Sequence, residues 1–262
     1  MASRTKQKEE ARARRMAEEA ERAQRARTQR RLRMVGGSVL GAVVVIVVAI
    51  AISSGGGASG LTTGAKATKT SSGVGQLLSG IPQSGAHLGN PKAPVTMTYY
   101  GDLQCPACQA FTVDGGFPQL IANDVRTGKV QVVYLGFETA TTDPAVFQTQ
   151  QVAALAAGEQ QHFWDFTELF YHEQGAEGSG YATESFFNGL AKQIPGLNYA
   201  RWLSARNNSA LAGQVQAEKQ SGLNIGIRGT PTLIFRGPHG KSQVPSAVPT
   251  YAQLEQTIKS VA

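Results

Sequence analysis

The sequence predicts an α/β domain over residues 86–262, and two kinds of pattern lead to this prediction. Three short β-prone runs, at 95–100, 130–135 and 232–235, are separated by stretches in which apolar residues recur at helical spacing. The first run leads directly into the only two cysteines of the chain. A stretch of this length buries enough apolar surface to form one domain with its own core.

The first half of this domain is predicted to alternate strand and helix. The strand 95–100 feeds a helix that begins at Cys105, and Gly128 ends helical structure before the strand 130–135. The sequence Asp114-Gly115-Gly116 is expected to interrupt the helix after the cysteines. We expect this break to alter the shape of the surface near the cysteines rather than their chemistry.

A helical insertion, about 140–222, is predicted between the second and third strands. Its expected helices are Asp143–Ala157, His162–His172, one opened by Thr183 and Glu184, and Asn198–Ser221 ended by Gly222. The aromatic residues of these helices are expected in the core, with Trp202 and Leu203 turned inward. After the strand 232–235, we expect a turn at 237–240, an edge strand to Val244 and a closing helix from about Tyr251.

The motif Cys105-Pro106-Ala107-Cys108 is typical of a redox-active dithiol. At the start of a helix, unpaired backbone N–H groups and the helix dipole favour a thiolate, which places the pKa of Cys105 in the range of roughly 3.5–7.5. We therefore expect Cys105 to be exposed at the helix N-terminus. Cys108, one turn further on, can reach Cys105 and close a disulfide.

Two other uses of this motif stay open. A zinc site needs a second pair of ligands, and the four histidines are widely scattered in the sequence, at His87, His162, His172 and His239. A purely structural disulfide would close a loop of only two intervening residues, so it would stabilise the fold weakly. We predict neither a metal nor a cofactor.

The basic charge of the chain belongs to its first 33 residues. Residues 1–33 carry 12 of the 25 Lys and Arg residues but only 5 of the 18 Asp and Glu residues, and they contain no aromatic residue. Nucleic-acid binding is disfavoured, because the tail has no aromatic residue to stack on bases and the rest of the chain is neutral. We predict a solvated cytoplasmic tail.

Residues 34–52 are predicted to form a single transmembrane helix. The 18 residues 35–52 carry no charge, and as a helix they span about 27 Å, close to the thickness of a bilayer core. Arg30, Arg31 and Arg33 lie immediately before them, so the positive-inside rule places the N-terminus in the cytoplasm and the α/β domain outside. A cleaved signal peptide is the alternative.

Residues 53–85 are rich in Gly, Ser, Thr and Ala at their start, and 53–80 contain no acidic residue. This composition is typical of a flexible tether. We therefore predict a single-pass cell membrane protein whose catalytic domain, 86–262, is connected to its membrane anchor by a flexible segment.

Three segments together resemble the DsbA-like thioredoxin-fold family. They are Gly89-Asn90-Pro91-Lys92-Ala93-Pro94-Val95, Tyr100-Gly101-Asp102-Leu103-Gln104-Cys105-Pro106-Ala107-Cys108, and Gly229-Thr230-Pro231-Thr232. The resemblance implies a thioredoxin-like fold with a helical insertion. It also implies that Cys105 attacks and Cys108 resolves, with Pro106 and Ala107 supporting the site.

The resemblance gives Thr230 and Pro231 roles beside the dithiol. It implies that Pro231 is a cis-proline packed against the cysteines and that Thr230 offers backbone hydrogen bonds to a substrate chain. Taken from the residues alone, Pro231 begins a strand, where a proline cannot donate to the sheet, and both a cis bond and a trans proline ending a loop stay open.

Tyr99 departs from the pattern of the family. It lies six residues before Cys105, where thioredoxin-like relatives often carry a buried acid that moves the proton of the second cysteine. Asp102 is the carboxylate nearest in sequence to the dithiol. It is a candidate for proton transfer, or equally a loop residue that caps the helix.

The resemblance implies an extracytoplasmic thiol:disulfide oxidoreductase that introduces disulfides into exported cysteine-containing proteins. Reoxidation is then expected from a separate membrane partner, either DsbB-like or vitamin K epoxide reductase-like. An extracytoplasmic disulfide reductase is the first alternative, because the same residues serve it at a lower potential. From another class, a tethered peptide-binding module with a structural disulfide stays open.

Overall fold

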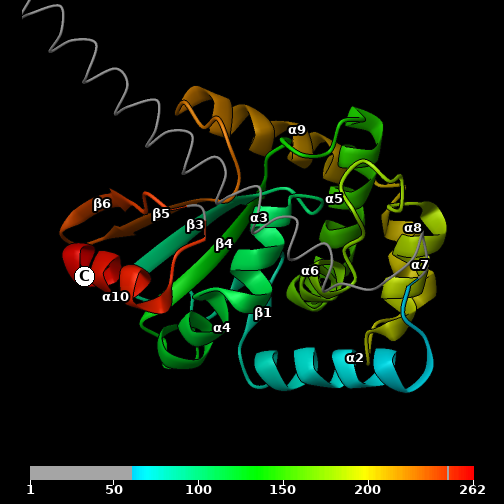
Figure 1. The fold of residues 1–262 in the computed structure, drawn as a ribbon, viewed down its shortest axis with the longest axis horizontal. Coiled ribbons are helices and arrows are strands. Elements are labelled where there is room, and N and C mark those ends of the chain that lie inside the picture. The colour runs from blue at the N-terminus through cyan, green and yellow to red at the C-terminus, as the bar shows by residue number, and fades with distance from the viewer. Residues whose placement is uncertain (1–60, 247) are drawn as a thin grey trace, which may run out of the picture. The chain divides into compact units, whose positions relative to one another are not determined.

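A computed structural model describes residues 61–246 and 248–262, and a six-stranded sheet lies among their helices (Figure 1). The strand order is β1-β2-β4-β3-β5-β6. The strands are β1 (Gln83–Ser84), β2 (His87–Leu88), β3 (Val95–Gly101), β4 (Val130–Gly136), β5 (Thr232–Gly237) and β6 (Gly240–Gln243).

The two central strands, β3 and β4, run parallel and pair from Val95 opposite Val130 to Gly101 opposite Gly136. β5 pairs antiparallel with the other side of β3, and β6 continues the sheet beyond it. Buried and half-buried side chains alternate along β4, as a pleated strand requires. The predicted α/β class, the three strands and the following edge strand are confirmed. β1 and β2, two residues each, are too short to show an alternating pattern.

The segment after the cysteines is helical but irregular, in the order α3 (Pro106–Gln109), the π-helical turn η1 (Ala110–Asp114), α4 (Phe117–Leu120) and a second π-helical turn η2 (Ile121–Val125). Gly115 has an extended backbone, so the predicted interruption is confirmed. The glycines also permit close packing: a Cβ atom on Gly116 would lie 2.7 Å from the backbone nitrogen of Tyr251. Tyr251 begins the closing helix α10 (Tyr251–Val261), as predicted.

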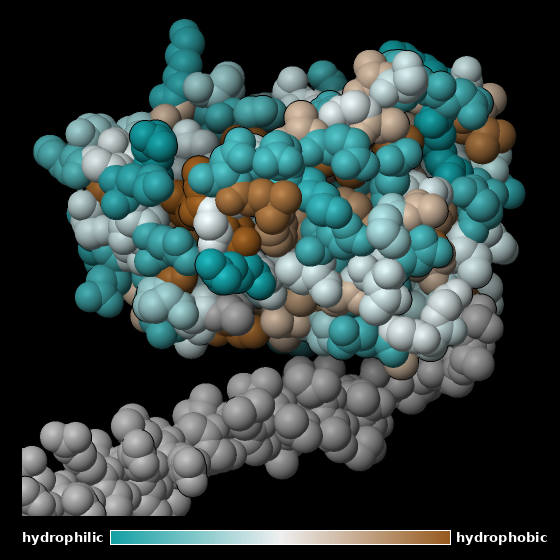
Figure 2. Space-filling view, turned by 90° about the horizontal axis from the view of Figure 1, so that it is seen from above, coloured by the Kyte–Doolittle hydropathy of each residue, from teal (hydrophilic) through white to brown (hydrophobic). Residues whose placement is uncertain are grey.

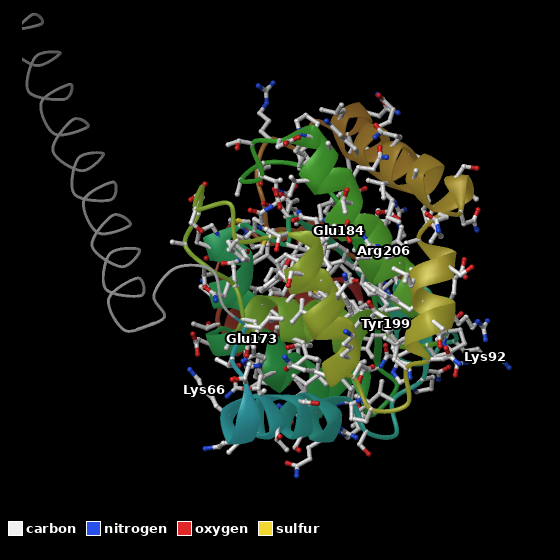
Figure 3. The ribbon with its side chains drawn as sticks, turned by 90° about the vertical axis from the view of Figure 1, so that its right-hand side faces the viewer. Lys66, Lys92, Glu173, Glu184, Tyr199 and Arg206 are labelled. Carbon is white, nitrogen blue, oxygen red and sulfur yellow. The ribbon has the colours of Figure 1, made fainter. Side chains whose placement is uncertain are left out.

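Five helices form the insertion: α5 (Pro144–Gly158), α6 (Phe163–His172), α7 (Glu184–Gln193), α8 (Tyr199–Ala205) and α9 (Ser209–Asn224). Side chains cap several of them: Asp143 accepts from the N–H of Ala145, and Thr183 from that of Phe186. Arg206 joins two helices through a double hydrogen bond to the Glu184 carboxylate, at 2.8 and 2.6 Å (Figure 3).

Three predictions about the end of the insertion are wrong. The expected helix Asn198–Ser221 is two helices, because the Asn208 side chain accepts from the N–H of Ala210 and starts a new one. Leu203 is 44% exposed rather than turned inward, while Trp202 is buried as expected. Gly222 lies inside α9, where a Cβ atom would lie 2.5 Å from the Phe137 ring, so its role is close packing rather than helix termination.

The predicted flexible tether, 53–85, is wrong over residues 64–78, which form helix α2 (Gly64–Leu78). Ala67, Val74 and Leu78 are buried at spacings that one helix face brings together, and the helix packs on α6 and α7. The N–H of Thr62 donates to the Glu173 carboxylate at 2.8 Å just before the helix begins; Glu173 is labelled in Figure 3. Most other residues of α2 are Gly, Ala, Ser and Thr, which gives the helix the composition of a linker.

The predicted tail, 1–33, and the predicted transmembrane helix, 34–52, lie outside the described residues. Within residues 61–246 and 248–262, no helix is long and apolar enough to cross a membrane.

Candidate active site around Cys105 and Cys108

The dithiol lies where the central strand β3 passes into α3. Cys105 is the residue that caps the N-terminus of α3, Pro106 is the first helical residue, and Cys108 lies within the helix. Both cysteines are free thiols. Cys108 is fully buried, and Cys105 is only 6% exposed, so the expectation of an exposed Cys105 is wrong. Pro106 and Ala107 between them are half-buried.

Thr230, which is distant from Cys105 in sequence, covers it in the structure. The Cys105 thiol donates to the carbonyl oxygen of Thr230 at 3.3 Å, and the bond between Thr230 and Pro231 is cis, as predicted. The Thr230 hydroxyl is in turn hydrogen-bonded to the hydroxyl of Thr139, in the loop after β4. The structure thus brings Thr230 and Pro231 to the dithiol, although Thr230 is 125 residues from Cys105 in sequence.

The two thiols have opposite acidities. A hydrogen bond from Cys108 is the main cause that lowers the pKa of Cys105 from 9.0 to about 7, against the opposing effect of burial; Thr230 and the N–H groups of Cys108 and Ala107 assist. Burial, together with the same hydrogen bond, raises the pKa of Cys108 well above 9.0. Cys105 is therefore the thiol that ionises near neutral pH, and Cys108 stays protonated.

Asp102 organises the loop beside the dithiol. Its buried carboxylate is surrounded by hydrogen-bond donors from three parts of the chain, at distances of 2.6–3.1 Å. The donors are the N–H groups of Gln104, Thr139, Ala140 and Thr141, the Thr141 hydroxyl and the Gln150 amide. Asp102 is thus a loop residue, as foreseen, but it does not cap the helix: the N-terminus of α3 receives no hydrogen bond from a capping side chain. Proton transfer by Asp102 stays a prediction.

The hydroxyl groups of Tyr99, Tyr134 and Tyr171 lie close to one another near Cys108. The sequence analysis identified only Tyr99 as a residue of interest. The Tyr171 hydroxyl lies 3.5 Å from that of Tyr99 and 3.3 Å from that of Tyr134. The Tyr99 hydroxyl also lies 3.0 Å from the Thr112 hydroxyl and 3.4 Å from the carbonyl oxygen of Cys108. Tyr134 and Tyr171 follow the apolar pattern of a strand and a helix, so the sequence assigns them to the core.

A cavity of about 430 Å³ lies beside the residue that precedes Cys105. It is lined by Gln104, by residues 140–149 in and before α5, and by residues 178–187 around the start of α7. No group of three or more His, Cys, Asp or Glu side chains in residues 61–246 and 248–262 is placed to hold a metal ion.

Hydrophobic residues are also exposed near the segment that leads to Pro231. Leu223 and Ile225, at the C-terminal end of α9, are 50% and 52% exposed. Figure 2, which views the domain from above Figure 1, shows hydrophobic residues gathered among hydrophilic ones on this face.

The family model described as Thioredoxin matches residues 83–259, from β1 almost to the end of α10. The chain belongs to the thioredoxin family. This confirms the thioredoxin-like fold that the sequence predicts. In this thioredoxin-family chain, free thiols of opposite acidity lie beside a cis-proline, which is the arrangement of a thiol:disulfide oxidoreductase.

Similar proteins are known from Bacillus. Probable disulfide bond formation protein D of Bacillus anthracis is 25% identical over 157 residues, which cover 57% of this chain and 69% of the relative. Disulfide bond formation protein D of Bacillus subtilis is 27% identical over 156 residues, which cover 56% of this chain and 65% of the relative. The alignments thus span about two thirds of each relative's length.

Solved structures share the fold. Oxidised BdbD of Bacillus subtilis has a TM-score of 0.58 and 22% identity, over 70% of this chain and 96% of that structure. DsbA2 of Pseudomonas aeruginosa has a TM-score of 0.53 and 21% identity, over 70% of this chain and 97% of that structure. These likenesses confirm the DsbA-like architecture, with its helical insertion, for the described domain.

Proposed function

We propose that this protein is an oxidase that introduces disulfides into exported proteins through Cys105 and Cys108. The observation that supports this most directly is the division of acidity between the two thiols. Cys105, with a pKa lowered to about 7, is a good leaving group at neutral pH, while buried Cys108 holds its proton. The names of the Bacillus relatives, which refer to disulfide bond formation, agree with this direction.

The proposed reaction begins with the Cys105–Cys108 disulfide. A substrate thiolate attacks the Cys105 sulfur, a substrate–Cys105 disulfide forms, and the electron pair of the broken bond passes to Cys108, which takes up a proton. A second substrate thiolate then attacks the substrate sulfur of this mixed disulfide and releases the Cys105 thiolate. The backbone of Thr230, which already contacts Cys105, is placed to pair with the substrate chain next to its cysteine.

The cellular setting of the proposal rests on the sequence. The 18 uncharged residues 35–52, with Arg30, Arg31 and Arg33 before them, support a retained membrane anchor and an extracytoplasmic domain. Disulfides persist in that compartment. Two electrons remain on the protein after each turnover, so we further propose a separate membrane oxidoreductase, DsbB-like or vitamin K epoxide reductase-like, as their acceptor.

One observation favours the reductase alternative. A pKa of about 7 for Cys105 is nearer the value of about 7 found in reducing thioredoxin than the value of about 3.5 found in oxidising DsbA. The reduction potential decides between the two. After equilibration of residues 61–262 with glutathione, a potential more positive than roughly −180 mV supports the oxidase, and one near roughly −270 mV supports the reductase.

Trapping of substrates tests the assigned roles of the thiols. We expect Cys108→Ser in the full chain to accumulate disulfide-linked complexes with exported proteins, because the second thiol that would release them is gone. Cys105→Ser serves as the matched control and should accumulate none. Equal trapping by the two variants would contradict the roles, and full function of the double serine variant would support a non-catalytic peptide-binding module instead.

A further inference from the structure

Three loops that are far apart in the sequence meet at the dithiol. β3 and β4 run parallel, so the loops that follow them leave the sheet at the same edge (Figure 1). β5 runs antiparallel to β3, and its first residue, Thr232, pairs with Tyr100 near the end of β3. The loop that precedes β5 and carries Thr230 and Pro231 therefore reaches this edge as well.

The Asp102 carboxylate joins the loop after β3 to the loop after β4. Its Oδ2 atom accepts from three successive N–H groups, those of Thr139, Ala140 and Thr141, at 2.9, 2.9 and 2.8 Å. Its Oδ1 atom accepts from the N–H of Gln104 at 3.0 Å and from the Thr141 hydroxyl at 2.6 Å. Hydrogen bonds to a charged acceptor are the stronger kind, so this contact fixes the path of the backbone over residues 139–141.

The Thr139 hydroxyl connects this fixed loop to Thr230, because the two hydroxyl groups are hydrogen-bonded to each other. Thr230 in turn contacts Cys105 in both states of the thiol. Its carbonyl oxygen accepts from the protonated thiol at 3.3 Å. Its hydroxyl donates to the thiolate, which helps to lower the pKa of Cys105.

The number of protons decides the direction of the bond between the two threonines. A hydroxyl group donates one hydrogen bond. While the Thr230 hydroxyl donates to the Cys105 sulfur, it can only accept from Thr139, so Thr139 is the donor. Without this donor, the Thr230 hydroxyl is free to turn toward water, and the thiolate loses part of its stabilisation.

We propose that Asp102 and Thr139 are positioning residues for the Cys105 thiolate. Asp102 fixes the backbone of the loop after β4, the Thr139 hydroxyl extends from that loop to Thr230, and the Thr230 hydroxyl donates to the Cys105 sulfur. Both residues thus act on the sulfur through Thr230. Their role in disulfide exchange rests on the proposed function, whereas their effect on the thiolate is measured in the reduced protein alone.

The first test removes only the Thr139 hydroxyl. Thr139→Val in the full chain keeps the branched shape of the side chain at an exposed position, and the reduced protein is titrated by thiolate absorbance. We expect the midpoint of Cys105 to rise from about pH 7 by roughly half a unit, the effect of losing one ordinary hydrogen bond.

Two further variants are controls for this titration. Thr139→Ser restores the hydroxyl and should titrate like wild type. Thr142→Val should do so too, because Thr142 is an exposed threonine of the same loop that lines the cavity, and its hydroxyl has no part in the path to Thr230. All these proteins keep the charged side chains of the three loops, which are Asp102, Glu138, Asp143 and Arg228. They also keep Cys108, which stays protonated in this pH range.

Thr139→Val should also alter the equilibrium with glutathione in a pH-dependent way. At pH 8, where the Cys105 thiolate predominates, the variant should favour the disulfide roughly threefold more than wild type does, because its reduced form is less stabilised. At pH 6, Cys105 is mostly protonated in both proteins, so the two equilibrium constants should agree. A change in packing alone would shift the constants equally at both pH values.

Asp102→Asn tests the start of the path by the sign of its effect. Loss of a negative charge near Cys105 would by itself favour the thiolate and lower the midpoint. An asparagine has one acceptor oxygen where the carboxylate has two, so part of the donor set loses its partner and the loop 139–141 is released. We therefore expect the midpoint to rise. Thr139→Val should add little in this background, since both changes break one path.

An unchanged midpoint in Thr139→Val would overturn the proposal, and so would an equal rise in Thr139→Ser. A midpoint that falls or stays constant in Asp102→Asn would remove Asp102 from the path. If Asp102→Asn does not fold, Thr139→Val decides, because it alters only an exposed side chain. Failure of the proposed function is different: wild type would then have the reduction potential of a reductase, while the midpoints of the variants would still differ.

Discussion

Cys105 and Cys108 acquire opposite acidities from one hydrogen bond. The thiol of Cys108 donates to the sulfur of Cys105, which lowers the pKa of Cys105 and raises that of Cys108. Burial raises both, but the Thr230 side chain and the first N–H groups of α3 also donate to the Cys105 sulfur and lower its pKa further. The sequence argument credited the helix N-terminus alone. The structure makes the neighbouring thiol the larger cause, so the two cysteines act as one unit.

Removal of Cys108 should therefore raise the pKa of Cys105. In Cys108→Ala, we expect the midpoint of thiolate absorbance to move from about pH 7 upward by roughly one unit or more, because the main donor is lost while burial persists. Thiolate absorbance measured against pH gives both midpoints. An unchanged midpoint would mean that the N–H groups of α3 and Thr230 are sufficient on their own.

At the scale of elements, α2 closes the hydrophobic core against the helical insertion. Val74 and Leu78 are 3% and 4% exposed, and both belong to the main core cluster. A helix that buries such side chains stabilises the domain, which a flexible tether does not. The boundary of the folded domain therefore lies before residue 64 rather than at 86.

Leu78→Ala should destabilise the domain by about 2–5 kcal/mol, the usual cost of truncating a buried leucine. Gln76→Ala, at an exposed position two residues before Leu78 and on the other side of the helix, is the control and should change stability little. Urea unfolding of residues 61–262 measures both. Equal stabilities of the two variants would restore the tether interpretation.

The sequence predicts an element well when a pattern within that element causes it to form, and poorly when contacts with distant elements do. The strands β3, β4 and β5 and helices α5, α6 and α10 follow from runs of residues whose periodicity is visible, and all were found. α2 was missed because its buried face has only three side chains and most of its other residues are Gly, Ala, Ser and Thr. The hydroxyl cluster was missed for a different reason: Tyr99, Tyr134 and Tyr171 come from three elements, and only the packing of β3, β4 and α6 brings them together.

In the candidate site, too, features marked by local motifs were predicted, and features that depend on packing were missed. Cys105, Cys108 and Pro231 are marked by motifs in the sequence, and the structure places them side by side. The resemblance places Thr230 beside the dithiol, but it does not indicate that Cys105 is buried there, because burial depends on how closely the chain around Thr230 packs on the Cys105 sulfur.

At the scale of the whole molecule, the ionisation of Cys105 links the redox state to folding stability. The pKa of Cys105 is depressed from 9.0 to about 7 in the reduced fold. The thiolate therefore stabilises this fold above the ordinary thiol pKa, and that contribution is lost as the pH falls through about 7. Cys108, whose pKa is raised, stays protonated in folded and unfolded chains between pH 6 and 8, so it adds nothing in this window.

Reduced wild type should consequently gain about 1 kcal/mol of stability between pH 6 and pH 8, relative to Cys105→Ser, which lacks the ionising thiol. For a domain of this size the gain corresponds to a rise of roughly 2–4 °C in melting temperature. Burial raises the pKa of Glu168 to about 8, but this residue is present in both proteins, so its own pH dependence cancels in the comparison. Calorimetry of both proteins in excess reductant at the two pH values measures the difference. A difference that stays constant with pH would mean that the fold does not favour the Cys105 thiolate, and the driving force proposed for disulfide donation would be absent.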